Sequence, residues 1–297
     1  MFLFKTGHIP VPKLLQLFVF LKKKRMDFNI KLSDGKVLNG YISSPGENTR
    51  AVIIMVHGLG EHIRRYSQLS EKLKDSGIGF TGVDLPGHGK SDGRRGHIKS
   101  YLVVKDMIDI LIRTTTHTFP GIPLLLYGHS LGGGIVLDYI LKYKPRIKGA
   151  IVTSPWLRLS FEPPKSKLVL ASIMKFILPG LVQPSGLNAD HISHDREVVE
   201  RYKSDPLIHD RISVSLFDSA MKAAGYSLKH ASELEIPVLL LHGSDDRITS
   251  PEGSREFASK NSKTMLRIFE GGYHELHNEP FREEVFDSVI SWIRNLR

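Results

Sequence analysis

The chain has 297 residues, of which 41% are hydrophobic and 24% are charged, and it contains no cysteine. This composition is typical of a folded protein, and the length is near the upper limit for a single hydrophobic core. The absence of cysteine excludes disulfides, a thiol nucleophile and thiolate metal ligands. It is compatible with a reducing cytoplasm but does not assign the compartment.

The net charge of +10 is distributed unevenly along the chain. Residues 1–25 hold six basic residues and no acidic residue, whereas the remaining residues hold 35 basic and 31 acidic side chains. The body of the chain therefore has nearly balanced charge, and no basic stripe interleaved with aromatic residues is present in it. These features argue against a nucleic-acid partner.

The N-terminal extension, residues 1–25, combines an apolar run at 14–21 with the basic cluster at 22–25. The run is too short to span a bilayer, and a signal peptide would place its basic residues before the apolar run. We expect an interfacial anchor that would hold a cytoplasmic protein peripherally at the membrane. A helix packed on the body, or an extension upstream of a natural start at Met26, are the alternatives.

The body shows strand patterns at first and then an alternation of strands and helices. Strand patterns at 28–32 and 37–42, joined through a turn at 33–35, predict a hairpin. The alternation that follows predicts a mostly parallel, doubly wound α/β sheet of eight strands. Further strands are expected at 51–56, 79–84, 124–127, 149–153, 236–241 and 265–269, and helices at 66–75, 102–113 and 281–296.

The alternation stops after Pro155 and resumes near residue 236. Five prolines lie between residues 156 and 230, together with an apolar run at 168–182. Helical segments suit this composition better than strands. We therefore predict a core of residues 26–155 and 231–297 with an inserted helical cap at 156–230. The apolar run would form either the core of this cap or an apolar lid.

A strand, a sharp turn and a helix follow one another without a break over residues 124–143. The turn reads Gly128-His129-Ser130-Leu131-Gly132, the Gly-x-Ser-x-Gly spacing of a nucleophile elbow, in which the glycines allow a strained turn and close packing. The pentapeptide alone is a weak signal, but the strand before it and the helix after it make it specific. Ser130 is the candidate nucleophile.

A serine nucleophile needs a base to remove its proton and an acid to hold that base. His274 follows the strand at 265–269, and Asp245 and Asp246 follow the strand at 236–241. These loops lie at carboxyl ends of strands, as Ser130 does, so we expect them to meet at one edge of the sheet. The order Ser, Asp, His is that of α/β-hydrolases, but the pattern does not separate Asp245 from Asp246.

Ester attack also needs hydrogen-bond donors for the developing oxyanion, and fixed backbone amides serve this purpose. We expect one donor at Leu131, directly after the nucleophile, and a second at Leu59 in the loop at 57–60. The remaining motif histidines, His57, His129 and His242, are expected to fix loops by hydrogen bonding. No metal site is expected, because the histidines lack the spacing with carboxylates that zinc enzymes show.

Taken together, the motifs resemble the monoglyceride lipase and lysophospholipase group of α/β-hydrolases, over residues 26–297. They are HGLGEH with RY (57–62, 65–66), DLPGHGKS (84–91), GHSLGG (128–133), SDPL (204–207), GSDDR (243–247) and GYHELH (272–277).

The resemblance implies that Asp246, just ahead of Arg247, is the acid rather than Asp245. It also implies that Glu61, Arg65 and His277 hold the polar glycerol head group. Without the resemblance, Glu61 and Arg65 could be a helical surface ion pair.

We therefore expect a serine hydrolase that cleaves the ester of a single-chain lipid, a monoacylglycerol or a lysophospholipid, through an acyl-enzyme on Ser130. No cofactor is expected, and a small lipid ester is the expected partner, with membrane-surface contact through the N-terminal extension and the cap. A broader carboxylesterase or an aminopeptidase of the same fold is the first alternative, and a noncatalytic ligand-binding protein is the second. A dehalogenase is disfavoured, since those relatives carry aspartate in place of Ser130.

Overall fold

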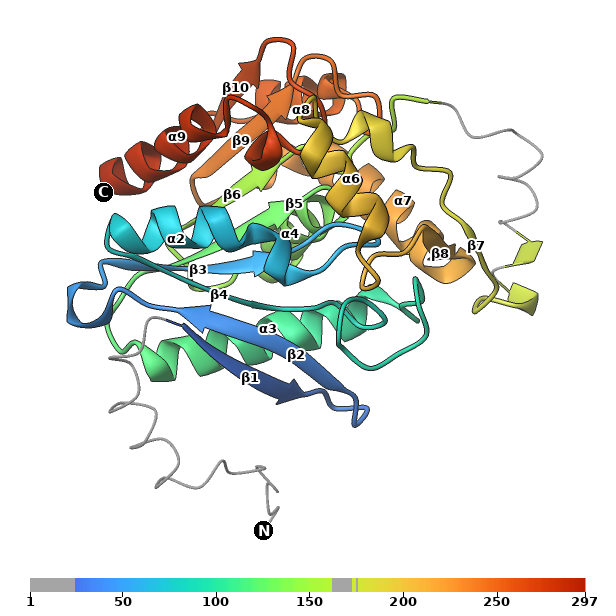
Figure 1. Ribbon diagram of the computed structural model, residues 1–297, viewed down its shortest axis with the longest axis horizontal. Helices are drawn as coiled ribbons and strands as arrows, with labels where there is room; N and C mark the ends of the chain where they lie inside the picture. Colours follow the sequence, from blue (N-terminus) through green and yellow to red (C-terminus); the bar gives the residue numbers. More distant parts are fainter. Residues whose placement is uncertain (1–24, 162–172, 175, 297) are drawn as a thin grey trace.

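The computed structural model describes residues 25–161, 173–174 and 176–296 (Figure 1). The predicted anchor lies outside the described residues except for Arg25, and so does part of the apolar run at 168–182. Figure 1 shows a twisted central sheet between two layers of helices. The sheet has eight strands in the order β1-β2-β4-β3-β5-β6-β9-β10.

Strand β2 runs antiparallel to both of its neighbours, and all other neighbouring strands of the sheet run parallel to each other. Strand β1 pairs with β2 and β2 with β4 in antiparallel register, while the other neighbours pair in parallel. This arrangement confirms the predicted mostly parallel α/β-hydrolase sheet. The strands are β1 (Arg25–Lys31), β2 (Val37–Ser43), β3 (Ala51–Val56), β4 (Ile78–Val83), β5 (Leu124–His129), β6 (Gly149–Thr153), β9 (Val238–Gly243) and β10 (Thr264–Phe269).

The helices that cover the sheet form two groups. Side chains of α2 and α9 pack in the hydrophobic cluster on one face, and those of α3, α4, α7 and α8 pack in the cluster on the other (Figure 1). Within the described ranges, no helix has the length and hydrophobicity required to cross a bilayer. The helices are α2 (Ser67–Asp75), α3 (Tyr101–Thr118), α4 (Leu131–Tyr143), α6 (Arg196–Ser204), α7 (Val214–Lys229), α8 (Pro251–Ser259) and α9 (Arg282–Asn295).

Strand β5 is buried on both faces, which fixes the position of the elbow at its end. Leu124 and Leu126 belong to one hydrophobic cluster, whereas Leu125 and Tyr127 belong to the other. Alternate residues of a strand point to opposite faces, so an uninterrupted apolar run suits a strand between two helix layers. Burying each such side chain contributes about 1.5–3 kcal/mol. The loop that follows β5 therefore starts from a rigid support.

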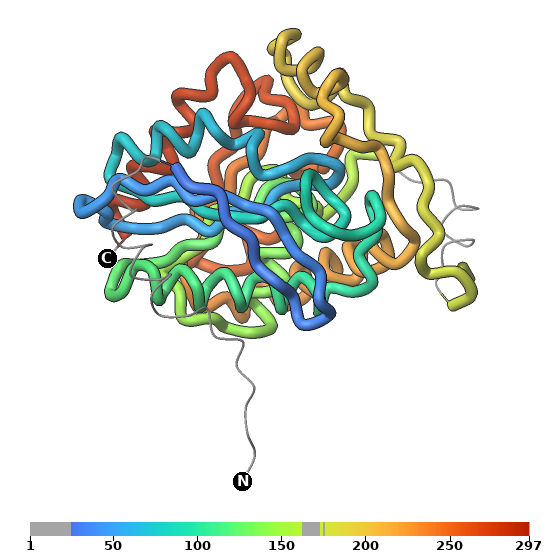
Figure 2. The backbone as a smooth tube through the Cα atoms, turned by 60° about the horizontal axis from the view of Figure 1, so that its bottom comes forward, coloured from blue at the N-terminus to red at the C-terminus, as the bar shows by residue number. Residues whose placement is uncertain are grey.

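The part of the chain predicted as a cap also contains a small sheet, which the prediction of helical segments missed. Strands β7 (Val182–Pro184) and β8 (Arg211–Ser213) pair antiparallel, and α6 lies between them in the sequence. Strands of three residues are too short to show an alternating pattern. Figure 2 shows this yellow part of the chain at one end of the molecule.

Helix α7 packs differently from the rest of the predicted cap. Its residues Leu216 and Ala220 belong to the same hydrophobic cluster as Val136 and Ile140 of α4. Part of the range 156–230 therefore contributes to the core under the sheet. The bounds of the insert stay a prediction.

Candidate active site

Ser130 occupies the turn between β5 and α4 in a strained conformation. Its backbone has φ 54° and ψ −117°, which is sparsely populated for a residue with a side chain. The flanking glycines allow this geometry, since a Cβ atom at Gly132 would clash with the carbonyl oxygen of Val56 and one at Gly128 with the backbone of Gly132 and Gly133. The predicted elbow is therefore present, with Ser130 at the carboxyl end of β5.

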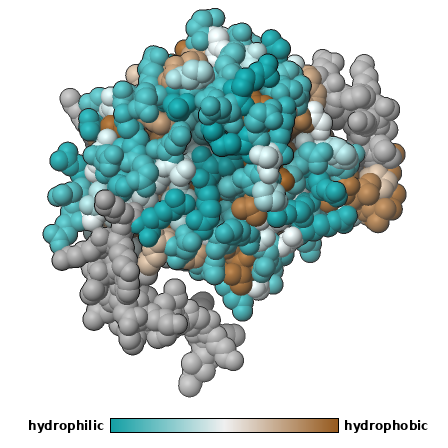
Figure 3. Space-filling view, viewed as in Figure 1, coloured by the Kyte–Doolittle hydropathy of each residue, from teal (hydrophilic) through white to brown (hydrophobic). Residues whose placement is uncertain are grey.

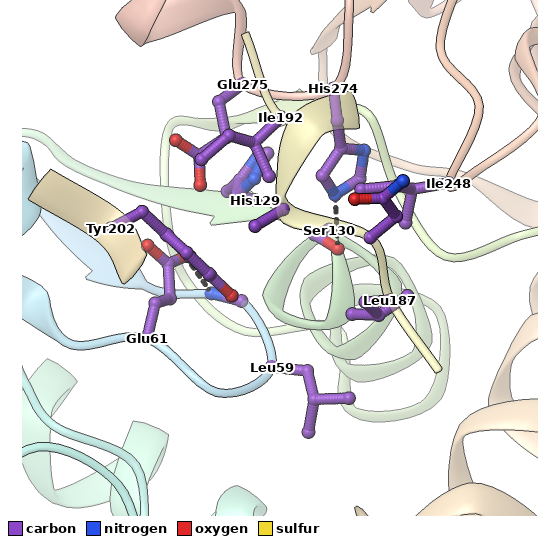
Figure 4. A pocket seen from close by; sticks show the side chains of 13 residues that line it. Leu59, Glu61, His129, Ser130, Leu187, Ile192, Tyr202, Ile248, His274 and Glu275 are labelled. Atoms are coloured by element: carbon purple, nitrogen blue, oxygen red, sulfur yellow. Dashed lines mark hydrogen bonds between the residues drawn. The ribbon is translucent and has the colours of Figure 1, made fainter. Parts of the chain in front are cut away.

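Three side chains from different loops form a hydrogen-bonded line. The Ser130 hydroxyl lies 2.8 Å from Nε2 of His274, and Nδ1 of His274 lies 2.7 Å from Oδ2 of Asp246. Figure 4 shows the His274 ring pointing at Ser130, and all three residues are buried. The loops after β5, β9 and β10 supply them, so parallel strands bring together groups that are far apart in the sequence. Their catalytic roles stay a prediction.

The two neighbouring aspartates have different surroundings. Oδ1 of Asp246 accepts hydrogen bonds from the amides of Ile248 and Thr249 at 2.8 and 3.0 Å, and its Oδ2 accepts one from the Thr249 hydroxyl at 2.9 Å. Asp245 is exposed and accepts a hydrogen bond from Ser244. Only Asp246 is therefore placed to hold His274.

His242 contacts the predicted acid, which the sequence reasoning did not foresee. The residue is fully buried, with Nε2 3.1 Å from Oδ2 of Asp246 and Nδ1 2.7 Å from the Ser254 hydroxyl. His242 fixes a loop, as predicted, but the loop it fixes is the one that carries Asp246. Its position four residues before Asp246, at the end of a buried strand, is the signal that could have indicated this contact.

The charges of Asp246 and His274 stabilise each other. Burial opposes ionisation of Asp246, yet His274 and the hydrogen bond from His242 outweigh burial and hold the pKa of Asp246 below its usual range. Burial also disfavours the charged form of His274 and by itself would lower its pKa. The adjacent Asp246 carboxylate outweighs burial and raises the pKa of His274 above the ordinary histidine value. The pair favours a carboxylate that can stabilise an imidazolium.

The loop after β3 presents a backbone amide beside Ser130. The amide of Gly58 donates to Oε1 of Glu61 at 2.6 Å, whereas the Leu59 amide has no acceptor among the described residues. Leu131 is the first residue of α4, so its amide has no acceptor within the helix. Within the part of the chain that the structure describes, neither predicted oxyanion donor has an acceptor, and their role stays a prediction.

His57 and His129 hold the loops around Ser130. Nε2 of His57 accepts from the Leu85 amide and its Nδ1 donates to the Gly58 carbonyl, both at 2.8 Å. Burial lowers the pKa of His57 to about 4, which keeps the ring neutral. His129 lies 3.0 Å from the Thr153 hydroxyl. Both histidines fix loops, as the sequence predicted.

Of the three predicted head-group residues, Glu61 and His277 are buried and Arg65 is partly buried, and their access to Ser130 differs. Arg65 binds Glu61 at 2.8 Å and both carboxylate oxygens of Glu275 at 2.5 and 2.6 Å. His277 stacks on Tyr66 with ring centroids 4.5 Å apart, and neither of its ring nitrogens has a partner among the described residues. Of the three, only Glu61 lines the cavity at Ser130. A head-group role stays a prediction.

A cavity opens at Ser130 beneath the cap (Figure 4). Its wall is apolar where Leu187 and Ile192 of the cap and Ile248 of the core meet, and it is acidic where Glu61 and Glu275 lie. Tyr202 of α6 closes another side. The cavity therefore offers an apolar wall and a polar wall to a molecule bound at Ser130.

Comparison with known proteins places the chain among hydrolases. Residues 47–281 match the family model described as serine aminopeptidase, S33. An uncharacterized abhydrolase domain-containing protein of Dictyostelium discoideum is 34% identical over 90% of the chain, which spans only 28% of that relative's length. The monoacylglycerol lipase of Mycolicibacterium smegmatis is 30% identical, with 84% of the chain and 90% of the relative covered.

The fold and the sequence also match a solved structure. The crystal structure of Paleococcus ferrophilus monoacylglycerol lipase superposes with a TM-score of 0.78 at 35% identity. The match covers 92% of the chain and 98% of that lipase. The chain therefore belongs to the serine aminopeptidase S33 family of α/β-hydrolases, and monoacylglycerol lipases are among its relatives.

Proposed function

We propose that the protein hydrolyses the ester bond of single-chain lipids, monoacylglycerols or lysophospholipids. The observation that carries this proposal is the line from Ser130 through His274 to Asp246, which opens into a cavity with an apolar and a polar wall. The relatives named monoacylglycerol lipase support the substrate class.

In the proposed reaction, the Ser130 oxygen attacks the ester carbonyl while Nε2 of His274 takes the hydroxyl proton. Asp246 holds the His274 ring and stabilises the imidazolium that forms. The oxyanion accepts hydrogen bonds from the amides of Leu59 and Leu131, and loss of one such donor typically costs about a hundredfold to a thousandfold in rate. His274 then protonates the leaving alcohol, and water, deprotonated by His274, cleaves the acyl-enzyme.

The walls of the cavity suit the two ends of such a substrate. An acyl chain against Leu187, Ile192 and Ile248 leaves water, and each buried methylene group contributes about 0.8 kcal/mol. We place the hydroxylated head group against Glu61, with Arg65 and His277 behind it. Arg65 pairs with both Glu61 and Glu275 and so offsets one of their two negative charges.

The cap exposes a group of apolar side chains, which we propose contacts a lipid surface. The described members are more than two-fifths exposed, and some of them form the brown area at the edge of the molecule in Figure 3: Ile173, Phe176, Ile177, Leu178 and Leu181. Clusters of this kind mark interaction sites. The basic N-terminal extension would add attraction to anionic lipid and keep the protein peripheral at the membrane.

Labelling with a fluorophosphonate probe tests the nucleophile. We expect the wild type and Ser244→Ala to be labelled and Ser130→Ala to be unlabelled, since Ser244 lies outside the line to His274. Label retained in Ser130→Ala would contradict the proposed mechanism.

A hydrolysis panel of monoacylglycerols, lysophospholipids, triacylglycerols, short aryl esters and aminoacyl anilides then tests the substrate class. Preference for the anilides would favour an aminopeptidase, and equal rates on all esters would favour a broad carboxylesterase. Liposome co-sedimentation of the protein lacking residues 1–25 tests the anchor, and unchanged binding would exclude it.

A further inference from the structure

A second hollow, which we call the arginine groove, lies between the start of α2 and the cap helix α6. Its wall includes His62, Arg64, Arg65, Arg201, Tyr202 and Asp205. The groove therefore brings three guanidinium groups together with a single lining carboxylate. The lining charges therefore favour an anion wherever an arginine can release its acidic partner.

Two of the three guanidinium groups hold only weak partners. Arg64 pairs with Asp27 at 3.0 Å and Arg201 with Glu197 at 3.4 Å, and these acids are 60% and 87% exposed. Exposed ion pairs contribute about 0–1 kcal/mol, so a ligand can replace the partner at little cost. Arg65 differs, because Glu61 and Glu275 already hold its charge. Binding of an anion in the groove would thus depend on Arg64 and Arg201.

Two residues of the groove wall, His62 and Arg64, each have a buried nitrogen atom without a partner among the described residues. Nε2 of His62 lies 2.9 Å from Asp205, but its Nδ1 is buried without a partner among the described residues, and so is Nε of Arg64. His62 itself is 5% exposed. Buried polar atoms usually have a hydrogen-bond partner, so these two nitrogen atoms are exceptions in the groove wall.

The groove adjoins the cavity at Ser130. Tyr202 lines both hollows, and the Arg65 guanidinium lies 4.8 Å from the centre of the Tyr202 ring. Glu61, which lines the cavity, binds the same Arg65. A substrate whose ester lies at Ser130 and whose glycerol lies at Glu61 would therefore extend its next group toward the groove. In a lysophospholipid that group is the phosphate.

We propose that the arginine groove binds the phosphate of a single-chain phospholipid, which makes lysophospholipids with an anionic head group the preferred substrates. The inference rests on the proposed function and extends it. Arginine forms paired hydrogen bonds with phosphate oxygens, so Arg64 and Arg201 suit this role better than lysine would. A monoacylglycerol has no group to place there.

The test compares 1-acyl-glycerol 3-phosphate with the monoacylglycerol of the same short, water-soluble acyl chain. We expect the wild type to have the higher kcat/KM on the phosphate-bearing substrate. The double variant Arg64→Ala, Arg201→Ala should lower the ratio of the two kcat/KM values at least tenfold, and Arg201→Lys should lower it less. Arg196→Ala is the matched control, because Arg196 is an 82% exposed arginine of the same helix that does not line the groove.

If the ratio of the two kcat/KM values is the same in the double variant and in Arg196→Ala, phosphate binding in the arginine groove is contradicted. The proposed function would remain intact. Failure of the wild type to cleave either lipid would instead overturn the proposed function. Inhibition of aryl ester hydrolysis by glycerol 3-phosphate and by inorganic phosphate distinguishes a lipid head group from free phosphate as the ligand of the groove. Stronger inhibition by glycerol 3-phosphate than by inorganic phosphate supports a head-group site, and equal inhibition by both contradicts it.

Discussion

The carboxyl edge of the sheet and the cap above it are built in different ways. Ser130, Asp246 and His274 are buried residues in loops that follow the buried ends of β5, β9 and β10. The described part of the cap, apart from α7, consists of short elements and leaves apolar side chains such as Phe176 and Ile177 exposed to solvent. The edge of the sheet holds the atoms of Ser130, His274 and Asp246 at hydrogen-bonding distance, whereas the cap exposes apolar side chains to solvent.

Because the two regions are built differently, we expect substitutions in them to have different effects on activity. Changes at the edge of the sheet should alter the chemical step on every substrate, because Ser130, His274 and Asp246 form one hydrogen-bonded line. Changes in the cap should alter which substrates reach Ser130, and should act on lipid substrates more than on small soluble esters. A cap substitution that abolished turnover of a small ester would contradict this assignment.

Asp246→Asn should cause a larger loss of activity than any change in the cap. An amide in place of the carboxylate turns the His274 ring to the wrong tautomer, which costs about 10⁴-fold in kcat in a comparable triad. Steady-state hydrolysis of an aryl ester measures the loss. Asp245→Asn, an exposed neighbour, is the control and should retain nearly full activity. Equal losses of kcat in both variants would contradict the assignment of Asp246 rather than Asp245 as the acid that holds His274.

His242→Ala should have the next largest effect, through the position of Asp246. A hydrogen bond to a charged group contributes about 1.5–3 kcal/mol, which corresponds to a tenfold to hundredfold loss in kcat if it acts only on the reaction. A role limited to folding would lower the melting temperature and leave kcat of the folded enzyme unchanged. A shift in the pH midpoint of activity would indicate that His242 acts through Asp246.

The pH dependence should follow the protonation of His274. The protonated ring cannot accept the Ser130 proton, so kcat/KM should fall about tenfold for each pH unit below the pKa of His274. Asp246 raises that pKa above the ordinary histidine value, and the midpoint should therefore lie above about 6.5. In Asp246→Asn the residual activity should have its midpoint at lower pH. A profile that is flat between pH 5 and pH 8 would exclude a histidine base.

The sequence predicted the edge of the sheet well because its physical signals are local. An uninterrupted apolar run marks a strand buried on both faces, and the expected ranges 51–56 and 149–153 coincide with β3 and β6. The strand, turn and helix around Ser130 were equally clear. The local pattern did not decide between Asp245 and Asp246, because that choice depends on which carboxylate faces His274, which lies 28 residues after Asp246.

The cap was predicted less well because its structure depends on contacts between distant segments. Strands β7 and β8 lie far apart in the sequence and stabilise each other, with three residues in each. The range predicted as cap also includes α7, whose Leu216 and Ala220 pack in the cluster of the core. The arginine groove likewise joins residues of α6 with residues near α2. No local pattern indicates such contacts.

The smallest effect is expected from the exposed apolar side chains of the cap. Ile177→Ser combined with Leu178→Ser removes two side chains that are 65% and 53% exposed, so the fold should lose little stability. If these side chains contact lipid, the variant should show a several-fold higher KM on vesicle-bound monoacylglycerol and an unchanged rate on a soluble aryl ester. Leu102→Ser is the control, because Leu102 is 66% exposed and lies on α3. Equal changes in KM for the variant and the control would show that loss of any exposed apolar side chain weakens lipid contact, and the cap would then have no special part in it.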